Sequence, residues 1–307
     1  MPLNRSKTRV ADKQSQLIQH YLQASLSDNT QQAYQNDLKQ FIQWGGRIPS
    51  SPQRVALYLA ENANRLSFAT LSRRVVAIGK AHEVKNIPSP THSVVVRDTL
   101  HGIRRLNGSV QRRVAPAMMS DIRTMVKGME GLKGARDRAL LLLGFAGAFR
   151  RSELVSITVE DVSFVAQGMI VHLKRGKTDQ AGKGRDVAIP YMRGMCCPVK
   201  ALLKWLAISE ISNGVVFRRI DRHGNLLGQR LSPQSVALLV KQRIMAIGKN
   251  AELYSGHSLR AGWVTNAALS GASAWKICQH TGHKSEAVMH RYIRSGNLFM
   301  NYPRIRN

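Results

Sequence analysis

Two arginines at the end of an apolar run are the first residues that could bind a phosphate. The run covers 139–149 and is followed by Arg150, Arg151 and Glu153. A guanidinium at the end of a buried helix is costly unless it meets a carboxylate or a phosphate. Glu153 could be that partner within the protein, and a solvated helix end is the other structural explanation. On its own, this motif does not decide between packing and phosphate binding.

A histidine and an arginine three residues apart form a second candidate. His257 and Arg260 stand at the start of the helix expected over 258–269, where that spacing puts them on one face. The unpaired N–H groups and the dipole at a helix start add to anion affinity. An imidazole beside a fixed guanidinium fork is therefore a plausible phosphate site. A capping histidine with an exposed arginine would be the structural explanation.

A lysine and a tyrosine could supply a proton donor and a nucleophile. Lys177 lies in a polar, glycine-containing stretch, where a lysine is usually solvated but could also reach a leaving oxygen in a DNA groove. Tyr292 follows Gly282-His283 by nine residues and stands among basic residues. Such a tyrosine usually packs in a core. Its phenol has a pKa near 10 and needs activation before it can attack.

The elements that must position these side chains are mainly helices. Hydrophobic periodicity predicts helices in the first hundred residues that begin near Ser27, Pro52, Phe68 and Ser93. Short β-like runs occur later, at 162–165, 169–173 and 187–189. They predict a small antiparallel sheet with a long turn. Further helices are expected over 120–129, 135–149, 198–208, 233–247, 258–269, 274–280 and 285–293.

The 307 residues suggest two domains at ~150 residues each. The expected division is a helical N-terminal domain over 1–106, a basic linker over 107–117 and a C-terminal domain over 118–307. In the linker, Gly108 breaks a helix and Arg112 and Arg113 are adjacent. The sequence favours a basic strap across a phosphate backbone here over a merely solvated linker.

The charge balance points to a polyanionic partner. Lys and Arg number 46 against 18 Asp and Glu, a formal net charge of +28. Residues 1–113 hold 17 basic and 6 acidic side chains, and residues 114–307 hold 29 and 12. Because both parts are basic, a charged tail on a neutral body is excluded, and both parts should contact the polyanion.

Membrane and secreted classes find no support. The longest apolar run, 139–149, is far short of the ~20 residues that cross a bilayer. Residues 1–16 are polar and basic, without the apolar stretch of a secretory signal. Cys196, Cys197 and Cys278 are a poor disulfide framework and favour a reducing cytoplasm.

Taken together and in order, these residues carry a resemblance. Arg150 with Glu153, a lysine in a β-turn, His257-x-x-Arg260, His283 and Tyr292 resemble the tyrosine recombinase (phage integrase) family across about 145 residues. The N-terminal block is similar to the helical core-binding domain of that family. The motifs that carry this second likeness are Thr30-x-x-x-Tyr34, Phe41-x-x-Trp44, 71–82 and 96–104.

The resemblance implies the fold class and architecture. The fold expected is mainly α with a small antiparallel β-sheet in the C-terminal domain, in the two-domain tyrosine recombinase architecture that forms a C-shaped DNA clamp. Larger integrases of the family carry an extra N-terminal domain, for which residues 1–11 are too few. We therefore expect a simple, Cre-type member.

The resemblance also implies a reaction. Tyr292 would attack a scissile DNA phosphate, form a 3′-phosphotyrosyl bond and release a 5′-hydroxyl. Lys177 would be the general acid on the leaving oxygen, and His257 would help to move protons at the nucleophile. The family uses neither metal nor ATP, so no cofactor is expected.

Four further side chains would stabilise charge in that reaction. Arg150 and Arg260 can bind the non-bridging oxygens of the phosphorane bidentately, and His283 can add a hydrogen bond. Glu153 would support them by orienting His257 or Arg150.

The implied partner is double-stranded DNA with specific recombination sites, bound by a homotetramer on two sites without a membrane. The outcome would be integration, excision or resolution of a mobile or circular element, in a bacterial cytoplasm, by a nucleoid-associated or phage-encoded protein. Basic residues are the expected DNA contacts, namely Arg73, Arg74, Lys80, Arg104, Arg105, Arg112, Arg113, Lys174 and Arg175.

Three other interpretations remain at this point. A type IB topoisomerase shares the Arg, Lys, His and Tyr set, but the block at 1–106 favours a recombinase. A non-catalytic DNA-binding regulator would have little use for Lys177, His283 and Tyr292 together. A zinc site built on Cys278-x-His280-x-x-His283 with His290 has ligand spacing loose enough to arise by chance.

Overall fold

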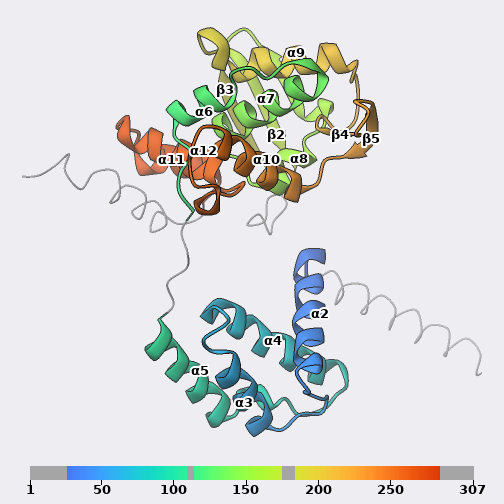
Figure 1. Cartoon of the computed structure of the whole chain (residues 1–307), viewed down its shortest axis with the longest axis vertical. Helices are drawn as coiled ribbons and strands as arrows, with labels where there is room; N and C mark the ends of the chain where they lie inside the picture. Colours follow the sequence, from blue (N-terminus) through green and yellow to red (C-terminus); the bar gives the residue numbers. More distant parts are fainter. Residues whose placement is uncertain (1–25, 109–113, 175–183, 284–307) are drawn as a thin grey trace, which may run out of the picture. The chain divides into compact units, whose positions relative to one another are not determined.

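The computed structural model describes residues 26–108, 114–174 and 184–283, and the chain divides into two compact units (Figure 1). The units are Met1–Arg112 and Arg113–Asn307, and each has its own hydrophobic core. The fold is mainly helical with small antiparallel sheets, which confirms the fold class expected from the sequence.

The N-terminal unit is built from helices whose apolar stripes meet in one core. Serine side chains cap the N-termini of two of these helices. The Ser51 hydroxyl accepts a hydrogen bond from the Arg54 backbone N–H, and the Ser67 hydroxyl accepts one from the Thr70 backbone N–H, each at 3.2 Å. Phe41, Tyr58 and Leu71 are among the fully buried residues. The elements are α2 (Asp28–Gln43), α3 (Pro52–Asn62), α4 (Phe68–Val84), the 3₁₀ turn η1 (Pro90–His92) and α5 (Val94–Asn107).

A buried carboxylate ties three of these helices together. Asp37 of α2 is 3% exposed and accepts two hydrogen bonds from Arg73 of α4, at 2.6 and 3.1 Å. The Arg74 Nε lies 3.6 Å from the same carboxylate, and Arg74 Nη1 donates to the Tyr58 hydroxyl of α3. Burial raises the pKa of Tyr58 above 10.0, although the charge of Arg74 opposes it. The buried carboxylate of this core is thus paired with arginine side chains, which offsets the cost of removing it from water.

The C-terminal unit is centred on α7, which is buried on most of its surface. Leu140, Leu141 and Leu143 are fully buried, and α7 packs against both α9 and α11. An apolar helix of this kind lies inside a unit rather than on its surface. The helices are α6 (Met119–Met125), α7 (Gly131–Ala146), α8 (Arg151–Ser156), α9 (Pro198–Ser209), α10 (Pro233–Ala246), α11 (Ser258–Leu269) and α12 (Ala274–Thr281). The 3₁₀ turns are η2 (Val159–Asp161), η3 (Gly194–Cys196) and η4 (Ala251–Leu253).

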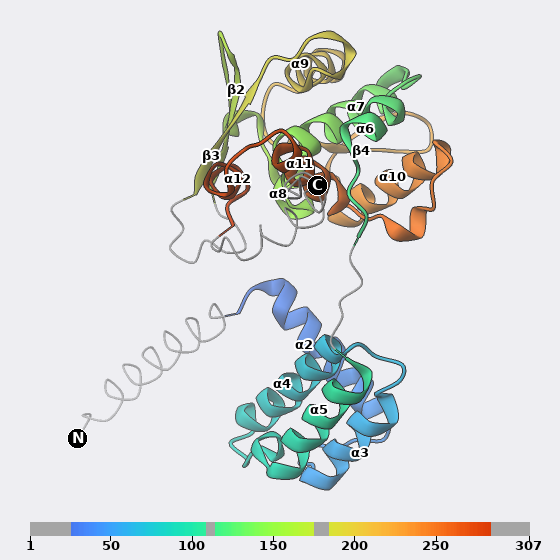
Figure 2. The same cartoon turned by 90° about the vertical axis from the view of Figure 1, so that its left-hand side faces the viewer.

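A three-stranded antiparallel sheet lies beside these helices (Figure 2). The strands are β1 (Val162–Val165), β2 (Gly168–Leu173) and β3 (Arg185–Pro190), with Val171 of β2 opposite both Val162 and Val187. Alternate residues of β2 and β3 face the core, as a half-buried strand requires. The sheet predicted from the β-like runs is confirmed, and the middle of its long turn, 175–183, lies outside the described residues.

Two elements were not expected from the sequence. A hairpin joins β4 (Arg218–Ile220) to β5 (Leu226–Arg230), and the short helix α8 follows α7 after a sharp turn. The expected helix over 135–149 instead spans Gly131–Ala146, because Ala148 adopts a left-handed φ of 48°. The helix expected over 285–293 lies outside the described residues.

The ends of the expected linker belong to neighbouring elements. Asn107 is the last residue of α5, and the amides of Ala115 and Ala117 donate to the carbonyls of Leu253 at 2.7 Å and Ser258 at 2.9 Å. Residues 109–113 lie outside the described part of the chain, so the basic strap and the boundaries 1–106, 107–117 and 118–307 stay predictions.

Within the described ranges, none of the helices combines the length and apolar character that a bilayer crossing needs.

The contact between Ala117 and α11 gives the first test of this fold. A Cβ on Gly262 would lie 1.8 Å from the Ala117 carbonyl oxygen, so Gly262→Ala forces the two segments apart. We expect the free energy of unfolding to fall by about 1–3 kcal/mol, measured by chemical denaturation. Gly228→Ala in β5 is the control, since no atom lies within 4 Å of its added Cβ. Equal stability of the two variants would contradict this packing.

Candidate active site

A tight turn between α7 and α8 places Arg150. The turn holds Gly147, Ala148 with its left-handed φ of 48°, and Phe149, whose side chain is 1% exposed. A Cβ on Gly147 would lie 2.1 Å from the Phe149 ring, so the ring packs directly on this glycine. The buried ring anchors the chain immediately before Arg150, which is the N-cap of α8.

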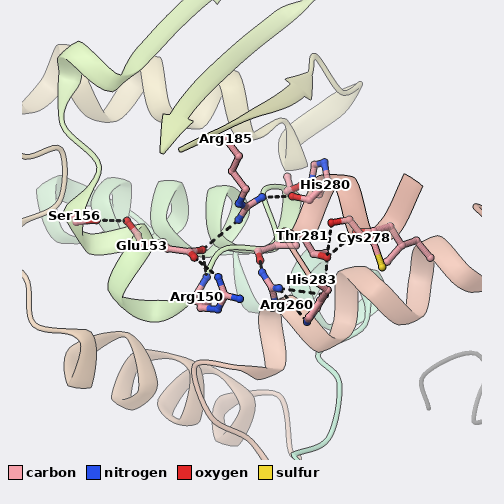
Figure 3. Close-up of polar contacts among 12 residues, drawn as sticks. Arg150, Glu153, Ser156, Arg185, Arg260, Cys278, His280, Thr281 and His283 are labelled. Atoms are coloured by element: carbon pink, nitrogen blue, oxygen red, sulfur yellow. Dashed lines mark hydrogen bonds and ion pairs between the residues drawn. The ribbon is translucent and has the colours of Figure 1, made fainter. Parts of the chain in front are cut away.

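Glu153 holds Arg150 by two contacts. Its Oε1 lies 2.5 Å from Arg150 Nη1, and its Oε2 accepts the Arg150 backbone N–H at 2.9 Å (Figure 3). The second contact is the reciprocal half of a capping box, which brings the carboxylate to the start of α8. The Arg–Glu pair that the sequence suggested is therefore present, with Glu153 only 4% exposed at its side chain.

Arg260 projects from the first turn of α11 into the same region. The residue is 1% exposed, and its Nη1 donates to the Ala148 carbonyl at 2.7 Å. Its Nη2 lies 3.1 Å from Nε2 of His283. The left-handed Ala148 thus presents its carbonyl to Arg260 while it also leads the chain into Arg150. His257 is the N-cap of α11, directly before the helix that the sequence predicted over 258–269.

Thr281 fixes the proton on the His283 ring. Its buried hydroxyl lies 2.7 Å from the Ile277 carbonyl, to which it donates, and 2.6 Å from His283 Nδ1. The hydroxyl oxygen therefore accepts from Nδ1–H, which leaves Nε2 to accept from Arg260. This assignment of the tautomer follows from the hydrogen-bond network.

The site favours neutral imidazoles. Burial, and then the charges of Arg260 and Arg150, lower the pKa of His283 from 6.5 to about 3. Partial burial of the imidazole, and then the charge of Arg260, also lower the pKa of His257, although the residue keeps an exposed surface. Burial alone would raise the pKa of Glu153, but the Arg150 amide and the nearby cations outweigh it and lower that pKa below 4.5. At neutral pH the region holds fixed cations, neutral imidazoles and one carboxylate.

Two residues that were not predicted for the phosphate site lie close to it. Arg185 Nη2 lies 3.3 Å from Glu153 Oε2, and the ring of His280 stacks on Trp263 with centroids 4.0 Å apart. The signal for Arg185 was available, since it shares the inward face of β3 with Val187 and Ile189. No sequence pattern indicated the His280 stack.

The expected DNA contacts have varied surroundings in the structure. Arg74 has only 11% of its side chain exposed and lies in the Asp37 network, while Arg73 keeps 48% exposure beside Asp37. Lys80 pairs with Glu83 and Lys174 with Asp161, and both lysine side chains stay more than half exposed. Arg104 lies over the Phe68 ring, and Arg105 is exposed. Contact of any of them with DNA stays a prediction.

Five predicted residues lie outside the described part of the chain, namely Arg112, Arg113, Arg175, Lys177 and Tyr292. The structure brings together Arg150, Glu153, Arg260 and His283 around the turn over 147–150, and His257 stands at the start of the helix that carries Arg260.

Two residues of the zinc interpretation have other contacts, and His290 lies outside the described residues. His280 Nε2 lies 2.9 Å from the Ala146 carbonyl, and His283 contacts Arg260 and Thr281. Among residues 26–108, 114–174 and 184–283, no three His, Cys, Asp or Glu side chains are grouped to hold a metal ion.

Comparison with known proteins identifies the family of the chain. A sequence profile of the phage integrase family matches residues 112–297, more than half of the chain. An integrase/recombinase XerD homologue of Selenomonas ruminantium is 40% identical over 289 residues, which cover 91% of this chain and 85% of the relative. The chain belongs to the phage integrase family. Its enzyme class is therefore tyrosine site-specific recombinase, as expected from the sequence.

More distant proteins share the fold of this recombinase. A tyrosine recombinase of Synechococcus elongatus is 28% identical over 297 residues, 90% of this chain and 88% of that protein. The structure of XerH bound to a difH substrate covers 81% of this chain and 70% of its own, with 18% identity and a TM-score of 0.60. The Tn1549 transposon integrase with circular intermediate DNA covers 91% and 92%, with 14% identity and a TM-score of 0.62. None of these matches favours a topoisomerase or a non-catalytic regulator.

The low pKa of His283 predicts a pH dependence of stability. Between pH 6.5 and about 3, His283 is protonated in the unfolded chain but stays neutral in the folded protein. The contribution of His283 to the free energy of unfolding is complete above pH 6.5. It is lost as the pH falls, by up to about 1.4 kcal/mol per pH unit. We expect His283→Gln to lose less unfolding free energy than the wild type between pH 7 and pH 5, measured by urea denaturation. Identical slopes would show that the ring is not held neutral.

Proposed function

We propose that this recombinase cuts and rejoins DNA at specific sites through a 3′-phosphotyrosyl bond to Tyr292. The observation that carries the proposal is the cluster of Arg150, Arg260, His257 and His283, which come from the start of α8, the start of α11 and the end of α12. A pocket of fixed guanidinium groups suits the extra negative charge of a phosphorane. These four residues follow one another along the chain in the order that is typical of the family.

The cluster suggests a role for each side chain. Arg150 and Arg260 bind the two non-bridging oxygens, and Glu153 keeps the Arg150 fork in place through the contacts described above. His283 is neutral and can contact the phosphate through its other tautomer, in which Nε2–H donates to a phosphate oxygen and the Thr281 hydroxyl donates to Nδ1. His257, also neutral at pH 7, can take a proton from the attacking phenol.

Lys177 completes the reaction as the general acid. The Tyr292 oxygen forms a bond to phosphorus while the bond to the 5′-oxygen breaks, and that oxygen takes its proton from the Lys177 ammonium. One phosphodiester becomes a phosphotyrosyl ester of similar energy, so the reverse attack reseals the strand without ATP.

The larger assembly belongs to the same proposal. Four copies on two DNA sites would exchange strands in pairs, and the result would be integration, excision or resolution of a mobile or circular element in the cytoplasm of a bacterium. The basic residues of both units, +28 in net charge over the chain, support an extended and salt-sensitive DNA contact.

The nucleophile is tested by Tyr292→Phe, which removes the phenol oxygen. We expect the variant to bind DNA normally and to form no covalent complex with a nicked suicide substrate, because the phenol oxygen that attacks the phosphate is gone. Tyr302→Phe is the matched control and should still be trapped on DNA. Trapping by Tyr292→Phe together with its loss in Tyr302→Phe would reassign the nucleophile.

The general acid is tested by Lys177→Ala. Cleavage should slow by about 10²–10⁴-fold, the usual contribution of a positioned proton donor. A 5′-bridging sulfur should restore the rate, since a thiolate leaves without protonation. Lys204→Ala, an exposed lysine of α9, is the control on both substrates. A slow Lys177→Ala reaction that sulfur does not restore would contradict this role.

A further inference from the structure

Arg185 is a largely buried cation to which the proposed reaction assigns no role. It is the first residue of β3, and only 18% of its side chain is exposed. Removing a guanidinium from water is costly unless hydrogen bonds and an opposite charge compensate for it. Its contacts therefore indicate what holds it in place.

The Arg185 guanidinium joins two separate segments of the unit. Its Nη2 lies 3.3 Å from Oε2 of Glu153 in α8, and its Nη1 donates to the carbonyl of His280 in α12 (Figure 3). The last four carbonyls of a helix lack partners within that helix, and His280 supplies one of these. One planar fork thus satisfies a carboxylate and a helix end together.

The first contact bears on Arg150. Glu153 uses Oε1 for Arg150 Nη1 and Oε2 for both the Arg150 amide and Arg185. A carboxylate held by two guanidinium groups has little freedom to rotate. Its orientation, and with it that of Arg150, therefore depends on Arg185.

The second contact bears on His283. Gly282 ends α12 in a left-handed conformation with φ of 68°, and its amide donates to Cys278. A Cβ on Gly282 would lie 2.8 Å from Nε of Arg185, so the guanidinium lies directly against this turn. His283 is the next residue, and its position depends on the turn that Arg185 supports.

We infer that Arg185 is a positioning residue for DNA cleavage, which holds Arg150 through Glu153 and His283 through the end of α12. The inference rests on the proposed function of the cluster. Arg185 acts through these two residues, and its loss lets both move away from the phosphate. A displacement of 1 Å in a catalytic group is enough to cost about 10²-fold in rate.

The test compares Arg185→Met with Arg185→Lys in the full-length protein. Single-turnover cleavage of a nicked suicide substrate should slow about 100-fold in Arg185→Met, while DNA affinity changes less than about threefold. Arg185→Lys keeps the charge and should recover at least tenfold of that loss. Arg218→Met is the matched control, since Arg218 is also a strand residue that donates to two carbonyls, those of Val215 and Asn213.

A second substrate separates positioning from general destabilisation. A methylphosphonate at the scissile position removes the charge that the arginines meet, so the defect of Arg185→Met should shrink at least tenfold on this DNA. A defect of equal size on both substrates, or an equal defect in Arg218→Met, would overturn the inference. Cleavage by Arg185→Met within threefold of the wild type would also overturn it.

A measurement without DNA keeps the inference separate from the proposed function. A wild-type protein that forms no covalent complex would contradict the proposed function alone. The coupling of Arg185 to Glu153 is then judged from thermal unfolding of Arg185→Met, Glu153→Gln and the double variant. We expect the fall in Tm of the double variant to be smaller than the two single falls combined. Additive falls would show that the two residues are not coupled.

Discussion

The crowding of like charges is the constraint on which the C-terminal unit depends. The positive charges of Arg260, Arg150 and Arg185 all lower the pKa of His283, and Arg260 is only 1% exposed. Such a cluster is stable only if the groups around it do not add further positive charge. The histidines meet this condition by staying neutral, and Glu153 offsets part of the charge. A bound anion would relieve this repulsion, which is the physical reason for proposing a phosphate site here.

Much of this unit could be predicted because its elements have clear local signals. The helix Ser258–Leu269 and the strands at 162–165 and 169–173 were expected almost as they occur. A period of 3.6 or 2 in apolar residues reflects one buried face, and that face is preserved in the fold. The order of Arg150, His257, Arg260 and His283 indicated the family. The contacts among them could come only from the structure, because they depend on three turns.

The missed features share a different cause. Arg185 stands at the end of a polar stretch, where the sequence gives an arginine no particular role, although it lies on the inner face of β3. The β4–β5 hairpin was missed because β4 has only three residues, and two are arginines. The end of α7 was misplaced because the apolar run continues through Phe149, although Ala148 leaves the helical conformation. In each case a tertiary contact overrides the local pattern.

The contact of Ala117 with α11 has a mechanical consequence. The chain that enters the C-terminal unit hydrogen-bonds to Ser258 and lies against Gly262, on either side of Arg260. Any shift of Ala117 is therefore passed directly to the turn of α11 that carries this arginine.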